Sequence, residues 1–268
     1  MTQHLMLKVG KILLSLLLLV GITVVAVSFM YRDLFVKAIY THEMFPQDWA
    51  RRQNDRGNTL RRQSWANDGE QRAALLAEAI EAYRAALTVH TYEAFPEDWA
   101  NVQNNLGCAL GDQAEVSDGE QRAALLTEAV EVYRAALTVY TREAFPRGWA
   151  RTQNNLGLAL RSQALASDGE QRAARLAEAV EAYRAASMDT QTDFPESWEG
   201  AQYNLGIALQ EQAEATEDKT EKRRLLHEAI TACENVLTFL TEDHFPWHRD
   251  AQQNLDNIRK LLEEVETL

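Results

Sequence analysis

Residues 95–107 read FPEDWANVQNNLG, and residues 145–157 repeat them as FPRGWARTQNNLG. The pair Phe-Pro occurs five times, about 50 residues apart, and a Trp follows each copy within four residues. The copies begin at Phe45, Phe95, Phe145, Phe194 and Phe245. A period of this length is typical of a repeat array, in which each copy buries its apolar face only by stacking on its neighbours.

Each repeat contains two predicted helices. The first begins at the Pro, because the missing N–H of Pro would have no partner in the first turn of a helix. Its apolar residues return at threes and fours and form one stripe. In the second repeat the stripe comprises Trp99, Val102, Leu106, Ala109, Leu110 and Gln113. Nothing in the repeats alternates with the period of a strand, so the predicted fold class is all-α.

The second predicted helix opens with residues 117–120, SDGE, and continues through residues 121–141, QRAALLTEAVEVYRAALTVYT. Its predicted buried face comprises Ala123, Leu126, Ala129, Val130, Tyr133, Ala136, Leu137 and Tyr140. Ser117 stands three residues before Glu120, a spacing that predicts reciprocal hydrogen bonds at the start of a helix. Ser167 with Glu170 repeats this capping box, and Asn67 with Glu70 is a variant of it.

Small and large residues alternate between the two helices in a recognisable way. Leu106-Gly107 is followed by Ala129, Tyr133 and Ala136, and the pattern returns in the next two repeats. This pattern resembles the tetratricopeptide repeat, most closely the longer repeats of kinesin-light-chain-like and bacterial signalling arrays. The resemblance covers about residues 32–268 and implies a right-handed superhelical solenoid of helix-turn-helix repeats.

The chain departs from that family in three places. Its repeat exceeds the usual length of about 34 residues. Arg56 occupies a position where Leu is expected, and Cys233 stands where the other repeats have Tyr. The two cysteines, Cys108 and Cys233, fit no zinc spacing and are interpreted as small buried fillers.

The predicted organisation follows the repeats. Residues 38–46 echo residues 138–146, so a half-repeat helix is expected before the first complete repeat. The predicted segments are a tail (1–11), a transmembrane helix (12–31), the half-repeat helix (32–46), repeats 1 to 4 (47–94, 95–144, 145–193 and 194–244) and a C-terminal capping helix (245–268).

The segment 12–31 carries no charged residue. Twenty helical residues span about 30 Å, the thickness of the hydrocarbon of a bilayer, so a retained single-pass anchor is predicted. The alternative is a cleaved signal peptide, with Lys8 and Lys11 as its basic region and a cleavage site near Ala26. Basic residues lie on both sides of the span, and the short basic tail favours a cytoplasmic N-terminus with an extracytoplasmic soluble domain.

The composition excludes several classes of function. The net charge of −13 argues against nucleic-acid binding, which needs a basic surface. No phosphate-binding loop, nucleophile motif or metal-ligand spacing occurs, so neither an enzyme activity nor a cofactor, metal site or small-molecule substrate is predicted.

The resemblance implies that the first helices line a concave partner-binding face. Its expected contact positions, counted from Leu-Gly, are Arg51, Asn54, Asn58, Asn101, Asn104, Asn105, Arg151, Asn154, Asn155, Tyr203 and Asn204. Asn both donates and accepts hydrogen bonds, so these residues could hold the backbone of an extended peptide. The alternative is that they bridge adjacent helices, as repeated residues of an array often do.

A second candidate site is a group of arginines in the first repeat: Arg51, Arg52, Arg56, Arg61 and Arg62. They could bind an acidic peptide or, close to a membrane span, anionic lipid headgroups. The alternative is a solvated, salt-bridged helix face.

The leading functional hypothesis is a membrane-anchored scaffold or adaptor that binds a protein or peptide on the concave face and contacts the bilayer through residues 12–31. One alternative is a structural accessory subunit of a larger membrane complex. Another is an adaptor for a separate bacterial signalling or defence effector.

Overall fold

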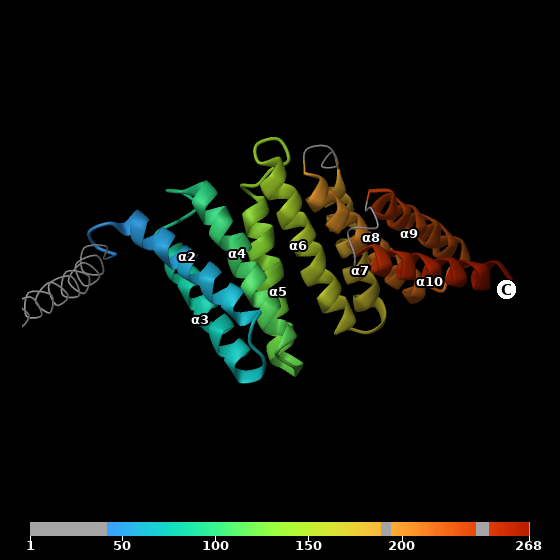
Figure 1. The fold of residues 1–268 in the computed structure, drawn as a ribbon, viewed down its shortest axis with the longest axis horizontal. Helices are drawn as coiled ribbons and strands as arrows, with labels where there is room; N and C mark the ends of the chain where they lie inside the picture. The colour runs from blue at the N-terminus through green and yellow to red at the C-terminus, as the bar shows by residue number, and fades with distance from the viewer. Residues whose placement is uncertain (1–41, 189–193, 240–246, 268) are drawn as a thin grey trace, which may run out of the picture. The chain divides into compact units, whose positions relative to one another are not determined.

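The computed structural model describes residues 42–188, 194–239 and 247–267 (Figure 1). The predicted tail, the predicted transmembrane helix and residues 32–41 of the predicted half-repeat helix lie outside these ranges. Within them, no helix combines the length and the apolar content needed to cross a bilayer.

The described residues form nine α-helices and contain no strand, which confirms the predicted all-α class for this part of the chain. The helices are α2 (Pro46–Ser64), α3 (Gly69–Leu87), α4 (Pro96–Glu115), α5 (Gly119–Leu137), α6 (Pro146–Leu165), α7 (Gly169–Ser187), α8 (Pro195–Ala215), α9 (Lys219–Phe239) and α10 (Trp247–Thr267). We call α2, α4, α6, α8 and α10 the first helices, and α3, α5, α7 and α9 the second helices.

The chain divides into two compact units, Met1–Arg52 and Gln53–Leu268. In the first unit the structure describes the start of α2 and the turn before it. There His42 lies edge-on against the ring of Trp49, with 4.9 Å between the centroids, and Arg51 approaches Asp48 at 3.5 Å.

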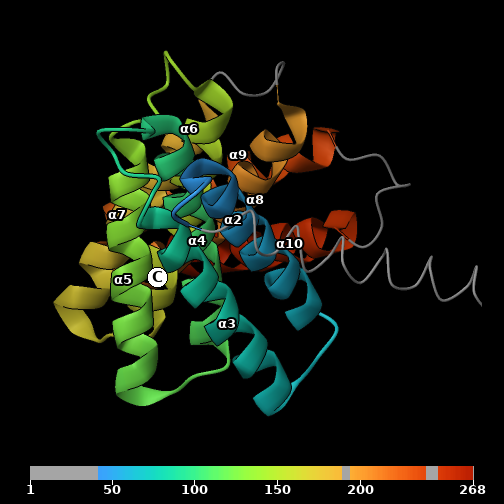
Figure 2. The same cartoon turned by 90° about the vertical axis from the view of Figure 1, so that its left-hand side faces the viewer.

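In the second unit, helices that are consecutive in the chain pack on one another (Figures 1 and 2). Helices α5, α7 and α9 each pack on the first helix before and the first helix after them, and α3 packs on α4. The first helices α4, α6 and α8 also contact one another directly. This succession of neighbouring pairs is a helical-repeat, solenoid-like arrangement.

The first helices begin where the sequence predicts. Pro96 and Pro146 occupy the first turns of α4 and α6, and the carbonyl before each Pro already accepts a helical hydrogen bond. In α4 the Trp99 N–H donates to the Phe95 carbonyl at 2.8 Å. The recurring Phe-Pro-x-x-Trp motif is therefore a helix start, with the Trp in the first turn.

The predicted capping boxes are wrong. Helix α5 begins at Gly119 after Asp118, which makes no side-chain capping bond. The Ser117 hydroxyl instead donates to the Gln113 carbonyl at the end of α4, over 2.9 Å. Gly119 has a φ of +49°, a left-handed conformation that glycine adopts without a steric penalty. The same glycine conformation opens α3 and α7, so the Asp-Gly pair, and not Ser and Glu, marks these helix starts.

The two helices of a repeat pack through a glycine and a tyrosine. A Cβ added at Gly107 would lie 2.6 Å from the ring of Tyr133. The same distance, 2.6 Å, separates Gly57 from the Tyr83 ring and Gly157 from the Tyr183 ring. Glycine is therefore required for the ring to pack this closely against the first helix.

The fourth repeat uses a smaller version of this contact. There a Cβ on Gly206 would lie 2.9 Å from the sulfur of Cys233, which is fully buried. Cys233 therefore fills the place of the tyrosine ring, as predicted for a buried filler, whereas Cys108 is only half-buried.

The predicted buried faces are largely confirmed. In α4, Val102, Leu106 and Leu110 are buried, while Trp99 is half-buried. In α5, Leu126, Ala129, Val130, Tyr133 and Ala136 are buried, and Tyr140 is buried just beyond the helix. Ala123 is exposed, contrary to the prediction, because the apolar spacing begins one turn before Leu126, the first residue of α5 that is buried. Leu137 is half-buried.

Candidate partner-binding surface

Asparagines of successive first helices are joined by side-chain hydrogen bonds. Asn105 donates through Nδ2 to Oδ1 of Asn54, one repeat earlier, at 3.0 Å. The next two repeats copy this bond: Asn155 donates to Asn104 at 3.2 Å, and Asn204 donates to Asn154 at 3.0 Å. Each bond forms one rung, and we call the set of these asparagines with Asn58 and Asn101 the amide strip. The strip bridges adjacent helices, as the structural alternative predicted.

The middle rung, between the second and third repeats, has the most partners. Asn104 is 2 % exposed, and its Oδ1 accepts from both Asn155 Nδ2 and the Thr152 hydroxyl. Asn155 also donates to the Cys108 sulfur at 3.4 Å. Sequence reasoning assigned no role to Thr152, although its position beside the Gln-Asn-Asn motif faces the preceding repeat.

The rungs leave hydrogen-bonding groups uncommitted. The Nδ2 of Asn105 donates to Asn54 and to Asn101, but its Oδ1 accepts from no described residue. In the last rung, Oδ1 of Asn204 likewise accepts from no described residue, and Nδ2 of Asn154 donates to none. These three asparagines are half-buried, so the strip has donors and acceptors available to a ligand.

Two other predicted contact residues are held differently. Asn58 Oδ1 accepts from the hydroxyl of Tyr83 at 2.9 Å, and burial raises the pKa of that phenol. Tyr203 takes the position of Asn104 in the fourth repeat and is half-buried. Its pKa is raised, first by burial and then by the charge of Asp250.

An apolar side chain lies next to the asparagines. Leu158, four residues after Asn154, is 40 % exposed although it is a large apolar residue in the middle of α6. The corresponding residue of α8, Ile207, is half-buried. Residues four apart share one face of a helix, so Leu158 continues the face that carries the amide strip.

The arginines of α2 are engaged with neighbouring groups. Arg56 forms an ion pair with Glu78 at 3.1 Å, and Arg61 forms one with Asp112 at 2.6 Å. Arg62 donates to the Thr59 hydroxyl at 3.4 Å. Arg51 meets Asp48, as described above, and Arg52 also has an interaction. Arg51 and Arg52 belong to the first compact unit and the other three to the second, so no single patch is described.

Ion pairs also join first helices, but not in every repeat. Arg61 binds Asp112 across the first joint, and Arg161 binds Glu211 across the third through two bonds of 2.8 and 2.6 Å. At the joint between the second and third repeats, the equivalent positions are Gly111 and Ser162, which cannot form an ion pair. Between the first helices α4 and α6, the polar contacts that the structure describes are therefore those of neutral side chains.

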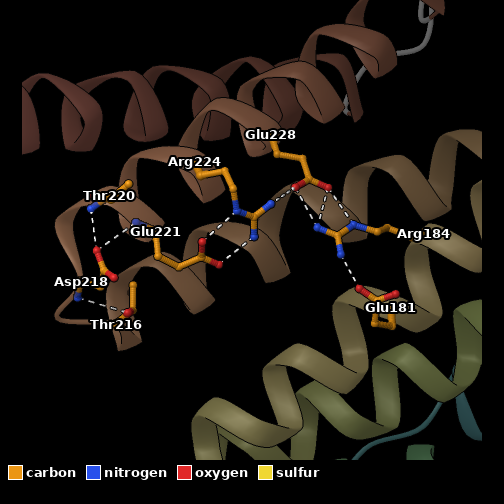
Figure 3. A network of polar contacts seen from close by, with 8 residues as sticks. All are labelled: Glu181, Arg184, Thr216, Asp218, Thr220, Glu221, Arg224 and Glu228. Carbon is orange, nitrogen blue, oxygen red and sulfur yellow. Dashed lines mark hydrogen bonds and ion pairs between the residues drawn. The ribbon is translucent and has the colours of Figure 1, made fainter.

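The second helices carry a different ladder. Arg84 pairs with Glu128, Arg134 with Glu178 and Arg184 with Glu228, each pair 44 residues apart. Figure 3 shows the last of these, where Glu228 accepts from both Arg184 and Arg224. A bidentate hydrogen bond from Arg224 also lowers the pKa of Glu221 below its ordinary value.

Within the described residues, no group of three or more His, Cys, Asp or Glu side chains is placed to hold a metal ion. A scan against protein-family models finds no match for this chain, and a search of curated proteins finds no relative.

Proposed function

We propose that this chain is a tetratricopeptide-type scaffold, anchored in a membrane by residues 12–31, that binds an extended peptide segment of a partner protein along the amide strip. The single observation behind this proposal is the set of amide C=O and NH₂ groups in the strip that bond no described residue. The last rung offers an uncommitted carbonyl on Asn204 and an uncommitted NH₂ on Asn154. A peptide backbone presents one donor and one acceptor per residue, so such pairs complement it whatever its sequence.

The two interpretations of the asparagines are compatible on this view. One side of each amide joins two repeats, which fixes the orientation of the other side. A side chain held in this way loses less entropy when it binds, and this favours affinity. Exposed Leu158 would supply an apolar contact for a side chain of the bound segment.

Photo-crosslinking in the native membrane tests the proposal. A photoreactive residue is placed at position 158, beside the amide strip, or at position 124, an exposed alanine on α5. We expect a partner to crosslink from position 158 and not from position 124. Leu158→Asp should lower the recovery of this partner at least fivefold, and the matched charge change Ala124→Asp should not.

The anchor is tested in the same experiment with a chain that lacks residues 12–31. With this shortened chain, the partner should no longer sediment together with the membrane. Crosslinks from position 124 alone, with recovery unaffected by Leu158→Asp, would instead support an accessory subunit that binds through its second helices. Such a result would rule out the strip as the binding surface.

A further inference from the structure

A pocket of about 620 Å³ lies where α6 begins. Its walls include the rings of Tyr140, Phe145 and Phe194, and its charged residues are Arg147, Arg151 and Glu97. Arg151 is also one of the predicted contact residues. Burial raises the pKa of Tyr140, and Asn101 of the amide strip lies close enough to the Tyr140 hydroxyl to oppose that rise. The pocket therefore adjoins the strip.

The two arginines of the pocket differ from most others in this chain. Arg147 and Arg151 lie one turn apart on α6 and are exposed, and neither forms an ion pair with a described residue. By contrast, Arg84, Arg134 and Arg184 all meet carboxylates. In a chain with a net charge of −13, two uncommitted guanidinium groups beside a cavity indicate that it takes an anion.

The start of α6 lacks the acids that α4 carries. Glu97 and Asp98 lie in the first turn of α4, where negative charge is favourable, whereas the matching residues of α6 are Arg147 and Gly148. A positive side chain in the first turn is unfavourable on its own. A bound carboxylate would supply the negative charge that α4 supplies from its own sequence.

The glycine at the start of α6 lies close to a tyrosine ring. A Cβ on Gly148 would lie only 3.1 Å from the ring of Tyr140, so an aspartate there would crowd the ring. At the corresponding place in the previous repeat, His90 and Asp98 lie 3.9 Å apart. The start of α6 thus lacks acidic residues and lies against the buried Tyr140 ring of the preceding repeat.

Each arginine lies close to one of the aromatic rings of the pocket. The Arg147 guanidinium carbon lies over the ring of Phe194, 5.8 Å from its centroid, which leaves the N–H groups at its edge available. The pKa of Tyr140 is raised by burial, while the nearby Asn101 side chain and the charge of Arg151 oppose that rise. Arg151 is therefore close to the phenol. Glu97, on the same pocket, leaves an excess of one positive charge among the three charged residues.

We propose that this pocket binds a carboxylate of the partner peptide together with a neighbouring apolar side chain. The carboxylate binds Arg147 and Arg151, and the apolar side chain packs between Phe145 and Phe194. This inference rests on the proposed function, because it assigns a chemical preference to one end of the same binding surface.

The test uses the full chain in detergent micelles and three short peptides that contain 4-fluorophenylalanine, followed by fluorine NMR at low salt. The first peptide has the core Ser-Phe-Asp-Ser and an amidated C-terminus. The second has Asn in place of Asp. The third also has Asn but carries a free C-terminal carboxylate. Together they separate a side-chain carboxylate from a terminal one.

We expect at least one carboxylate peptide to bind ten times more tightly than the neutral peptide, and the one that does so identifies the source of the carboxylate. The double variant Arg147→Ala, Arg151→Ala should abolish this preference. The control Lys222→Ala, Arg223→Ala on α9 removes the same charge and should retain it. Both pocket arginines are exposed, so their loss should leave the circular dichroism spectrum of the chain unchanged.

Equal binding of all three peptides, or a preference for a carboxylate peptide that survives in the double variant, would contradict the proposal that this pocket binds a carboxylate. If partner recovery still depended on Leu158 in that case, only the proposed carboxylate site would be wrong, and the proposed scaffold function would be retained. If the carboxylate preference were present but no partner crosslinked from position 158, the scaffold would fail and the pocket would remain a peptide site.

Discussion

The first helices and the second helices are both linked from repeat to repeat by polar rungs, but with different chemistry. The asparagine rungs of the first helices are neutral amides, such as Asn204 to Asn154 at 3.0 Å, and their residues are half-buried or, at Asn104, buried. Two of the three joints between these helices also carry an ion pair, Arg61 with Asp112 and Arg161 with Glu211. The second-helix rungs are Arg–Glu pairs, such as Arg84 with Glu128 at 2.7 Å, and lie nearer to solvent. The same repeat period thus supports two kinds of link on two surfaces.

This difference bears on which surface suits a ligand. An exposed guanidinium–carboxylate pair is satisfied by its partner and by water, and adds little to stability. A half-buried amide cannot use water so freely, and a group that it leaves uncommitted gains from a new partner. We therefore expect the first-helix surface to be sensitive both to substitution and to ligands, and the second-helix surface to tolerate change.

The largest effect should come from the contact that lies between the two surfaces. Gly157→Ala places a methyl group 2.6 Å from the ring of Tyr183, which is fully buried and has no room to move. We expect a loss of about 2 kcal/mol in the free energy of unfolding, measured by urea titration of the full chain in micelles.

Gly111→Ala is the matched control, because nothing lies within 4 Å of a Cβ at that position on α4. Alanine is the better helix former, so this variant should gain up to about 1 kcal/mol. Equal effects of the two substitutions would show that the Gly–Tyr contact does not hold the helix pair together.

The next effect concerns an amide rung. A double-mutant cycle with Asn154→Ala and Asn204→Ala should give a coupling energy of about 1 kcal/mol, the usual net value of one partly buried hydrogen bond. The coupling should change little with salt, because neither group is charged. A coupling energy of zero would show that these amides bond to water instead of to each other. The two surfaces would then not differ in the strength of their links.

The smallest effect is expected on the second helices. A cycle with Arg134→Ala and Glu178→Ala should give about 0.5 kcal/mol or less, because about half of each side chain is exposed. This coupling should fall further in about 1 M salt, where charges are screened within about 3 Å. A value that exceeded the amide coupling and resisted salt would reverse the comparison.

Much of the fold could be predicted because its signals are local and repeated. Pro96 and Pro146 mark helix starts through the chemistry of one residue, and the spacing of Val102 and Leu106 marks a buried face through the geometry of one helix. The second-helix starts were predicted at the wrong residues because two local signals overlap there. Ser117 can bond forward or backward, and the left-handed Gly119 decides which.

The candidate site could be predicted only in outline. The repeated asparagines mark a face of the first helices, but both interpretations of them were consistent with the sequence. The pocket at α6 was not foreseen, because it depends on the fit of the Tyr140 ring over Gly148 and on the arrival of Phe194 from the next repeat. A signal existed in the exchange of Glu97-Asp98 for Arg147-Gly148 between two otherwise similar helix starts.

The helical class, the repeat length and most of the buried residues of each helix follow from helix periodicity and proline chemistry, because both act over a few neighbouring residues. The folded arrangement was needed to show which asparagine bonds which, how Arg61 and Arg161 meet carboxylates in the following repeat, and which arginines form no ion pair with a described residue. These pairings join residues about 50 positions apart, and a hydrogen bond depends on differences of less than an ångström that periodicity does not specify.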